Sequence, residues 1–321
     1  MPVPQVIDMS CVPRIPMPNH MEEKERPAIN IVNATHTLEG EGFEVRRAFT
    51  EIEHQMVDPF ILLDHMGSVE YSPGEAKGAP DHPHRGFETV TYMIDGELEH
   101  RDSNGGGGII KDGATQWMTA GSGIIHSEMP TEGIVTKGGL FHGVQLWVNL
   151  PRTLKWSPPQ YQDVEAHKVT LLASQDSGAI LRVIGGEVCG YKGPSITRTP
   201  VSYVHATIFP GARLEVPWPK QFNALIYVMT GSGTIGQSMT PLKEGQLAIL
   251  GHGDYVSVSG DSQRDSLSTT TEMLLLGGTP INEPIYWYGP FVMNTRNDIV
   301  EAMEDYQSGR MGHIPAKISG V

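Results

Sequence analysis

The chain has 321 residues and a formal net charge of −14, from 23 basic and 37 acidic side chains. This excess of negative charge argues against direct binding to nucleic acid phosphates or to anionic membranes. No apolar run reaches the ~18 residues of a membrane-spanning helix, and the first residues lack the apolar core of a secretion signal. Two cysteines cannot form a disulfide framework, so we expect a cytoplasmic protein, or a nuclear one in a eukaryotic cell.

The first part of the chain differs in pattern from the rest. Residues 1–28 carry no repeating apolar pattern, and we expect a disordered or extended N-terminal segment there. The chain that follows contains short alternating or β-branched segments, separated by turns rich in glycine and proline. Residues 88–94 and 144–150 show this strand pattern, and Asp95-Gly96 is a typical turn after the first of them. These features predict many short strands rather than long helices.

Short motifs of the first half return in the second half in the same order. Residues 227–231 resemble residues 92–96, which end a predicted strand at a glycine turn. Residues 243–245 resemble residues 111–113, where a lysine and an acidic residue precede glycine. Two copies in the same order indicate a duplicated β-domain.

The expected architecture is therefore all-β, with two tandem jelly-roll barrels. Prolines cluster after residue 150 and suggest a boundary near residue 160, which gives an N-terminal domain at 29–160 and a C-terminal domain at 161–321. Near the end, Thr295 and Asp298 form a capping-box pattern, and Gly309 can end the helix that it begins. We expect one short C-terminal helix.

Two motifs of the first half carry metal-ligand residue types at alternate positions. His82 and His84 are separated by one residue, as are His126 and Glu128. Alternate side chains of a β-strand share a face, so each motif points two donors in one direction. Neighbouring strands would bring the three imidazoles and the carboxylate within reach of one divalent metal. Iron, manganese, nickel, copper and zinc all suit these donors.

One acidic residue and several histidines leave alternatives open. Glu88 follows the first histidine motif, and its parity matches that of the two histidines. The carboxylate ligand could therefore come from Glu88 or from Glu128. The remaining histidines stand alone in their motifs and are expected to be structural or exposed; they include His54, His65, His100, His142 and His252. Of these, His142 is the best further candidate for lining the pocket.

The second half lacks an equivalent set of donors. The repeated motifs place Pro217 and Pro219 where the first half has its two histidines. No histidine or carboxylate takes the place of His126 or Glu128 around Val256. Proline and valine side chains offer no lone pair to a metal. We expect the C-terminal domain to be free of metal ligands.

Three sequence segments of the first half resemble a known family. They read DHPHRGFETV at 81–90, QWMTAG at 116–121 and IHSEMP at 125–130, and they closely resemble the two signature motifs of the pirin family. Pirins belong to the cupin superfamily, so the resemblance implies two cupin barrels of which only the N-terminal one holds metal. It implies Fe(II) as the metal. The implied ligands are His82, His84, His126 and Glu128. Glu88 would then orient a neighbouring group instead of binding the ion.

The resemblance implies two functions for the same site. Some pirins cleave flavonols such as quercetin as 2,3-dioxygenases, and others are described as transcription co-regulators or as partners of metabolic enzymes. The chain would then be an Fe(II)- and O2-dependent oxygenase of a small aromatic chelating substrate. Alternatively, it would be a metal- or redox-dependent regulator that binds a protein partner without catalysis of its own. In the oxygenase, Glu128 would also be catalytic, by accepting a proton from the substrate hydroxyl.

Overall fold

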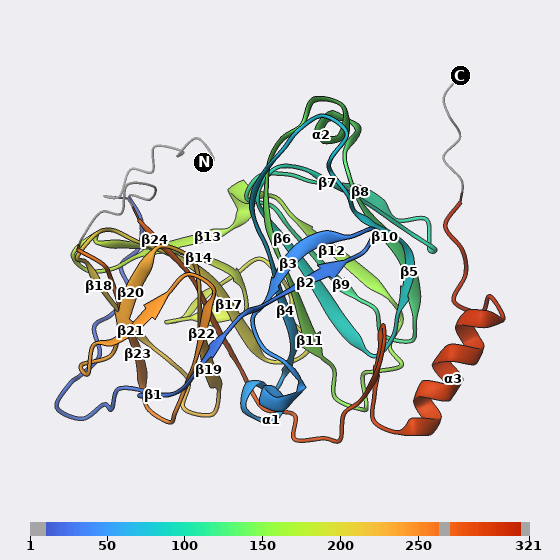
Figure 1. The fold of residues 1–321 in the computed structure, drawn as a ribbon. Coiled ribbons are helices and arrows are strands. Elements are labelled where there is room, and N and C mark those ends of the chain that lie inside the picture. Colours follow the sequence, from blue (N-terminus) through green and yellow to red (C-terminus); the bar gives the residue numbers. More distant parts are fainter. Residues whose placement is uncertain (1–10, 263–269, 316–321) are drawn as a thin grey trace. The chain divides into compact units, whose positions relative to one another are not determined.

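The computed structural model describes residues 11–262 and 270–315, and Figure 1 shows their fold. Most of the regular structure in these residues is β-strand, and the longest helix lies near the C-terminus. The short helices α1 (His54–Val57) and α2 (Glu132–Lys137) were not expected from the sequence. Among the residues described, no helix has the length and apolar character needed to cross a membrane. The prediction of an all-β chain with a short C-terminal helix is confirmed.

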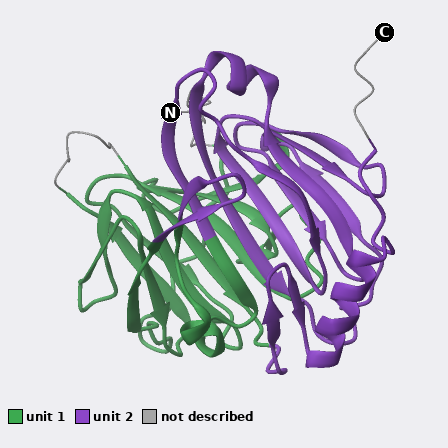
Figure 2. Cartoon of the chain, turned by 45° about the vertical axis from the view of Figure 1, so that its right-hand side comes forward, with its two compact units in different colours: residues 1–35, 46–63, 167–280 green, residues 36–45, 64–166, 281–321 purple. Residues whose placement is uncertain are grey.

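The chain forms two compact units, which Figure 2 shows in different colours. Unit 1 contains the described parts of residues 1–35, 46–63 and 167–280, and unit 2 contains those of residues 36–45, 64–166 and 281–321. Each unit is therefore built mainly from one half of the chain, but each also takes in a segment from the other end. A single boundary near residue 160 does not describe this exchange, because strand pairing and not chain order decides where the terminal segments belong.

Unit 2 carries a seven-stranded and a four-stranded sheet. The larger sheet has the order β12-β9-β6-β11-β4-β3-β2, and the smaller has the order β5-β10-β7-β8. The strands of the larger sheet are β2 (Thr35–Glu39), β3 (Phe43–Arg47), β4 (Phe60–Tyr71), β6 (Phe87–Asp95), β9 (Thr115–Thr119), β11 (Gly139–Asn149) and β12 (Gln160–Val164). Those of the smaller sheet are β5 (Ala79–His84), β7 (Leu98–Asp102), β8 (Gly107–Ile110) and β10 (Ile124–Pro130). The hairpin of β25 (Tyr286–Tyr288) and β26 (Phe291–Met293) follows much later in the chain.

Unit 1 repeats this arrangement. Its sheets have the orders β1-β22-β19-β24-β17-β14-β13 and β18-β23-β20-β21. The strands of the larger sheet are β1 (Ala28–Asn33), β13 (Thr170–Ala173), β14 (Ala179–Gly185), β17 (Val201–Ile208), β19 (Asn223–Thr230), β22 (Gln246–Leu250) and β24 (Thr271–Gly278). Those of the smaller sheet are β18 (Arg213–Pro217), β20 (Ser232–Ile235), β21 (Thr240–Lys243) and β23 (Tyr255–Gly260). A two-stranded ribbon joins β15 (Glu187–Val188) and β16 (Tyr191–Lys192).

The strand orders of the two units match element by element. The run β9-β6-β11-β4 of unit 2 corresponds to β22-β19-β24-β17 of unit 1, and the smaller sheets correspond in full. The resembling motifs at residues 92–96 and 227–231 close equivalent strands, β6 and β19. The duplication inferred from the sequence is therefore present in the fold.

The barrel interior of unit 1 is filled by apolar side chains. Leu214 and Val216 of β18 and Val256 and Val258 of β23 belong to one buried hydrophobic cluster. In the part of the chain that the structure describes, both groups of residues that could hold a metal lie in unit 2 instead. Aliphatic side chains thus occupy buried positions of β18 and β23, the strands that correspond to the histidine-bearing β5 and β10.

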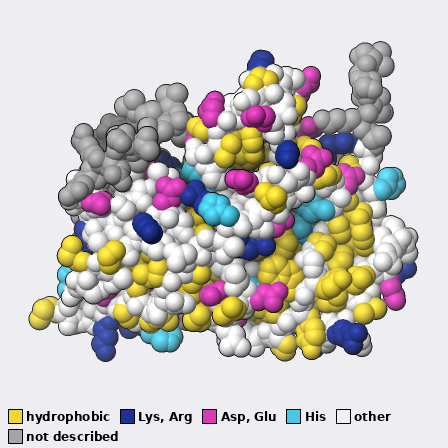
Figure 3. Space-filling view, in the orientation of Figure 1, with side chains coloured by type: hydrophobic (Ala, Val, Ile, Leu, Met, Phe, Trp, Pro, Cys, Tyr) yellow, Lys and Arg dark blue, Asp and Glu magenta, His cyan; other side chains and the backbone are white. Residues whose placement is uncertain are grey.

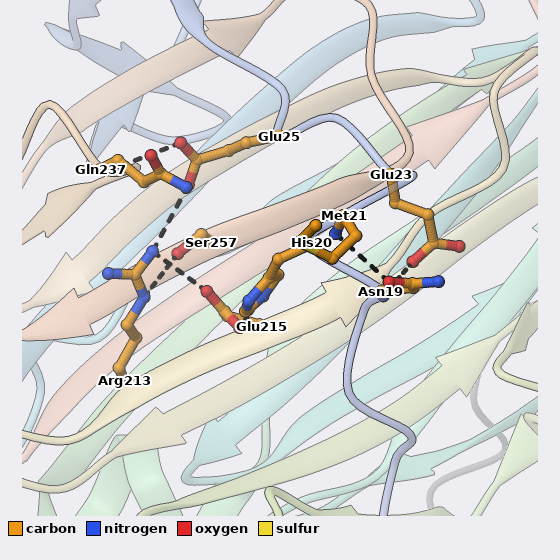
Figure 4. A network of polar contacts seen from close by, with 9 residues as sticks. All are labelled: Asn19, His20, Met21, Glu23, Glu25, Arg213, Glu215, Gln237 and Ser257. Carbon is orange, nitrogen blue, oxygen red and sulfur yellow. Dashed lines mark hydrogen bonds and ion pairs between the residues drawn. The ribbon is translucent and has the colours of Figure 1, made fainter.

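The N-terminal segment from residue 11 onward is extended and held against unit 1. Ile15 is only 1% exposed and joins the hydrophobic cluster of that unit. Figure 4 shows how the segment continues over a polar network. His20 lies 2.9 Å from Glu215, and Glu25 lies 3.6 Å from Arg213. Of the segment expected to be disordered or extended, residues 1–10 lie outside the described part of the chain.

The C-terminal helix α3 (Arg296–Gln307) begins as its sequence predicts. The Thr295 hydroxyl accepts a hydrogen bond from the Asp298 amide, and the Asp298 carboxylate accepts one from the Thr295 amide. Ile299 and Ala302 are buried in a cluster of unit 2. Tyr306, further along the helix, is 40% exposed. The helix is held by local capping and by one narrow apolar face.

Candidate metal centre

Three histidines of the smaller sheet of unit 2 come together on one face. β5 pairs with β10 so that His82 lies directly opposite His126. The His82 ring centroid lies 4.3 Å from that of His126 and 4.7 Å from that of His84. The rings of His84 and His126 are 4.8 Å apart. Because both motifs lie inside regular strands, the alternation expected from the sequence brings these imidazoles together.

The hydrogen bonds of two of these rings fix which nitrogen is free. His82 Nδ1 lies 2.7 Å from the Pro80 carbonyl oxygen, and His84 Nδ1 lies 3.4 Å from that of Pro290. A carbonyl oxygen only accepts, so each Nδ1 carries the proton and each Nε2 presents a lone pair. These two Nε2 atoms are 3.1 Å apart. Two lone pairs facing each other repel unless a cation lies between them, so the arrangement fits a metal ion.

Burial keeps the inner imidazoles neutral. Burial, reinforced by the neighbouring His82, lowers the pKa values of His84 and His126 well below the usual range. A neutral imidazole is the form that binds a metal. His126 Nε2 is buried and has no hydrogen-bond partner among the residues described. Such an atom is costly in an apolar interior unless something binds it.

Glu128 is held beside this cluster by donors from the larger sheet. Its Oε1 accepts a hydrogen bond of 2.6 Å from the Thr91 hydroxyl, and its Oε2 accepts one of 2.9 Å from Gln145 Nε2. One possible ligand group joins His82, His84 and His126, and a second joins His100, His126 and Glu128, with ligand atoms within 4.8 Å of one another in each. His126 belongs to both groups. The four predicted ligands are therefore neighbours, although Glu128 is grouped with His126 and not with the other two.

His100 is the residue that the sequence reasoning did not single out. It lies on β7 directly opposite Glu128, and it is fully buried. A signal was present, because His100 and Asp102 alternate in a short strand that follows the Asp95-Gly96 turn. That strand pairs with the one carrying His126, which the sequence alone did not indicate.

Glu88 lies outside the cluster, and its expected parity is wrong. β5 ends at His84 and a turn at Gly86 separates it from β6, so the alternation does not continue. Gly86 has φ +93°, and a Cβ there would lie 2.1 Å from the Val292 carbonyl oxygen. Along β6, Glu88 faces away from Thr91, the residue that reaches Glu128. Glu88 Oε1 instead accepts a hydrogen bond from the Thr119 hydroxyl at 2.7 Å.

His142, the other histidine considered as pocket lining, belongs to neither ligand group. Its Nε2 lies 2.8 Å from Nε2 of His65, and its Nδ1 lies 3.7 Å from Asp95. Both histidines are buried. These contacts assign His142 a structural role within unit 2.

Buried polar contacts fix the turn that follows the ligand strand. Lys155 Nζ donates to the carbonyl oxygens of Gly86 and Val292 at 2.7 and 2.8 Å, and to Asn149 Oδ1 at 2.7 Å. These bonds tie the turn to β26, and the same hairpin supplies the carbonyl that binds His84. The C-terminal hairpin therefore orients a candidate ligand that lies some two hundred positions earlier in the chain.

Aromatic rings lie on one side of the centre. The Trp147 ring is 5.1 Å from His84, 4.4 Å from Phe87 and 6.0 Å from Trp287. His82 and Trp147 are partly exposed, whereas His84 and Phe87 are buried. Figure 3 shows hydrophobic side chains gathered over the region of β5, β9 and β12, with a histidine side chain at the edge of this area. The cluster thus reaches solvent beside flat apolar surfaces.

Comparisons with known proteins agree with this fold. A family model described as Pirin matches residues 42–148, and one described as Pirin C-terminal cupin domain matches residues 203–312. A pirin-like protein of Solanum lycopersicum is 41% identical over 290 residues, which cover 90% of this chain and 94% of that protein. Human pirin is 39% identical over 282 residues, which cover 87% and 91%.

A solved structure resembles the chain over nearly its whole length. The crystal structure of a quercetin 2,3-dioxygenase from Acinetobacter baumannii has a TM-score of 0.84 and 38% identity, and the match covers 91% of this chain and 100% of that one. The expected fold of two tandem cupin barrels is confirmed. The two family matches together span most of the chain, and both relatives match along nearly their whole length. The chain therefore belongs to the pirin family.

Proposed function

We propose that the protein binds one Fe(II) ion through His82, His84, His126 and Glu128 and oxidises a flavonol-like substrate with O2. The observation that carries the proposal is the convergence of unprotonated imidazole nitrogens. His82 and His84 Nε2 face each other at 3.1 Å, and His126 Nε2 is buried without a partner among the described residues. Such an arrangement stabilises a bound cation and is unfavourable without one.

The donor set suits a first-row metal. Three neutral imidazoles and one carboxylate are ligands that iron accepts, and the choice among divalent metals depends on geometry as well as affinity. Bound iron would supply the redox chemistry with dioxygen, which amino acid side chains cannot supply. The similarity to the Acinetobacter baumannii quercetin 2,3-dioxygenase supports this metal-dependent oxygenase function for the chain.

The surroundings suit a flat aromatic substrate. Phe87 and Trp147 lie within 5.1 Å of the His84 ring, and Trp287 extends this aromatic surface. Fused aromatic rings gain from offset or edge-to-face contacts with such side chains. The partly exposed His82 and Trp147 give the substrate a way in from solvent. A flavonol combines a planar apolar body with an ortho-hydroxy ketone, so it matches both the aromatic wall and the cation.

Glu128 is positioned to act as a proton acceptor. Hydrogen bonds from Thr91 and Gln145 hold one oxygen each, and every carboxylate oxygen keeps a further lone pair. A substrate hydroxyl that approaches the metal would meet this carboxylate. Accepting its proton leaves the substrate electron-rich, which favours its oxidation.

The test is oxygen consumption with quercetin. Protein loaded anaerobically with Fe(II) is compared with metal-free protein and with protein loaded with Zn(II), which has no redox chemistry. We expect oxygen uptake and loss of quercetin absorbance only with the iron-loaded protein, and a lower rate in the Trp147→Ala variant. If iron binds with one ion per chain and oxygen uptake does not exceed that of the zinc control, the oxygenase proposal is wrong.

A further inference from the structure

The three candidate histidine ligands differ in what their outer nitrogen touches. His82 and His84 each donate Nδ1–H to a backbone carbonyl, which turns the Nε2 lone pair toward the cluster. Among the described residues, no backbone carbonyl accepts from the outer nitrogen of His126. Its Nδ1 lies 3.4 Å from Nδ1 of His100, another imidazole nitrogen that can donate or accept. The direction of this one bond decides whether His126 can present a lone pair to a metal.

The surroundings of His100 settle that direction. His100 Nε2 lies 2.8 Å from the Tyr161 hydroxyl and 3.9 Å from Asp102 Oδ2. The negative charge of Asp102 favours an N–H on this nitrogen. Burial, followed by the nearby Asp102 carboxylate, raises the pKa of Tyr161 above its usual range. The phenol therefore keeps its proton, and its oxygen, 2.8 Å away, can accept from His100 Nε2.

The proton on His100 Nε2 determines which nitrogen of His126 carries its proton. Because His100 Nε2 carries the proton of the neutral ring, His100 Nδ1 is an acceptor. His126 Nδ1 must then donate to it, which leaves the lone pair on His126 Nε2. This is the buried nitrogen that has no hydrogen-bond partner among the described residues. His100 thus accepts the Nδ1 proton of His126, as backbone carbonyl groups accept those of His82 and His84.

We propose that His100 is a positioning residue that turns the Nε2 lone pair of His126 toward the metal and is not itself a ligand. The inference rests on the proposed metal site. Tyr161 and Asp102 hold His100 in the required tautomer. Groups that orient a ligating histidine in this way tune metal affinity, and their loss weakens binding by ~10–100-fold.

The backbone around Asp102 is shaped to keep these side chains in contact. Asp102 lies on β7 directly opposite His126, and both residues are almost fully buried. Gly106 lies so close that a Cβ there would come 2.1 Å from Asp102 Oδ2 and 3.2 Å from the Tyr161 ring. A side chain at this position would separate the carboxylate from the phenol. Gly106 therefore has a packing role in the turn after β7.

The experiment measures Co(II) affinity and the visible absorption spectrum of the cobalt-loaded protein. Affinity is taken from competition with a chelator, and the spectrum reports the number and type of ligands. In His100→Leu no group accepts from His126 Nδ1, so we expect affinity to fall by ~10–100-fold while the spectrum at saturating Co(II) stays unchanged. His100→Gln offers a carbonyl oxygen and should recover most of the affinity. Tyr161→Phe should weaken binding by less.

The matched control is His142→Leu, which removes another buried histidine of unit 2 that belongs to neither ligand group. Its Co(II) affinity should stay within threefold of the wild type. An unchanged affinity in both His100→Leu and Tyr161→Phe would overturn the inference. A spectrum that loses a ligand in His100→Leu would also overturn it, because His100 would then be a ligand. If the wild type binds no Co(II), the proposed metal site itself is wrong.

Discussion

Replacing Glu128 with glutamine removes one negative charge from the candidate metal centre and keeps the shape of the side chain. The present carboxylate accepts bonds of 2.6 Å from Thr91 and 2.9 Å from Gln145. Glutamine can keep both contacts, because the threonine hydroxyl donates or accepts and the Gln145 amide can turn over to present its oxygen. The Glu128→Gln variant should therefore fold.

The cost in stability and the cost in metal affinity differ in size. A hydrogen bond to a charged group contributes ~1.5–3 kcal/mol and a neutral one ~0.5–1.5 kcal/mol, so two weakened bonds cost ~2 kcal/mol. The ligand atoms of the group containing Glu128 lie within 4.8 Å of one another. Two unit charges 4 Å apart attract by ~4 kcal/mol at an effective dielectric constant of ~20, so a divalent ion that close to the carboxylate would be attracted by ~8 kcal/mol. The neutral glutamine and nearby water recover part of this lost attraction. A residual loss of ~2.7 kcal/mol in binding free energy weakens metal binding ~100-fold.

The control is Glu88→Gln, which also removes one negative charge from a buried carboxylate. Glu88 lies on the face of β6 that points away from Thr91 and therefore from Glu128. The variant weakens the bond from Thr119, so thermal unfolding should shift to lower temperature as in Glu128→Gln. Its metal affinity should stay within threefold of the wild type. Both variants are loaded identically with Fe(II), and metal content and chelator competition are measured. If Glu88→Gln empties the site while Glu128→Gln keeps its metal, the assignment of the carboxylate ligand is wrong.

Gly86→Ala should destabilise the protein by ~3 kcal/mol or more, because its Cβ would lie 2.1 Å from the Val292 oxygen at φ +93°; an unchanged midpoint of denaturant unfolding would contradict this. Burial lowers the pKa of Lys155 from 10.5 to about 7. The unfolded chain therefore binds more protons between these values, and wild-type stability relative to Lys155→Met should rise with pH by up to ~1.4 kcal/mol per unit. A difference that stays flat from pH 7 to 9.5 would refute the burial argument. Thr295→Ala should cost ~1 kcal/mol by removing the α3 cap, and Thr295→Ser should restore most of it.

The sequence by itself determined the features that depend only on residues close together in the chain. His82 and His84 share a face because both lie inside β5, and His126 and Glu128 do so because both lie inside β10. The capping box at Thr295 formed for the same reason, since its two bonds join residues three positions apart. Alternation along a strand and caps at a helix end are local geometry, so residue types in order suffice to predict them.

The error at Glu88 shows where this reasoning ends. Parity carries along a strand only while the strand continues, and the turn at Gly86 moves the chain from the smaller sheet to the larger one. The sequence shows the glycine, but it does not show that the Val292 carbonyl oxygen packs against it. That contact joins positions far apart in the chain, so no local sequence pattern could predict it.

Only the tertiary structure decided which distant segments complete the centre. His100 reaches His126 because β7 pairs with β10, and the Pro290 carbonyl reaches His84 because the C-terminal hairpin belongs to unit 2. β1 lies in the first half of the chain but likewise pairs with β22, a strand of the second half, in unit 1. Pairing between strands depends on the packing of many residues across both sheets, whereas the face of a side chain within one strand depends on its position alone. The motifs therefore predicted the candidate ligands, and the fold supplied the groups that orient them.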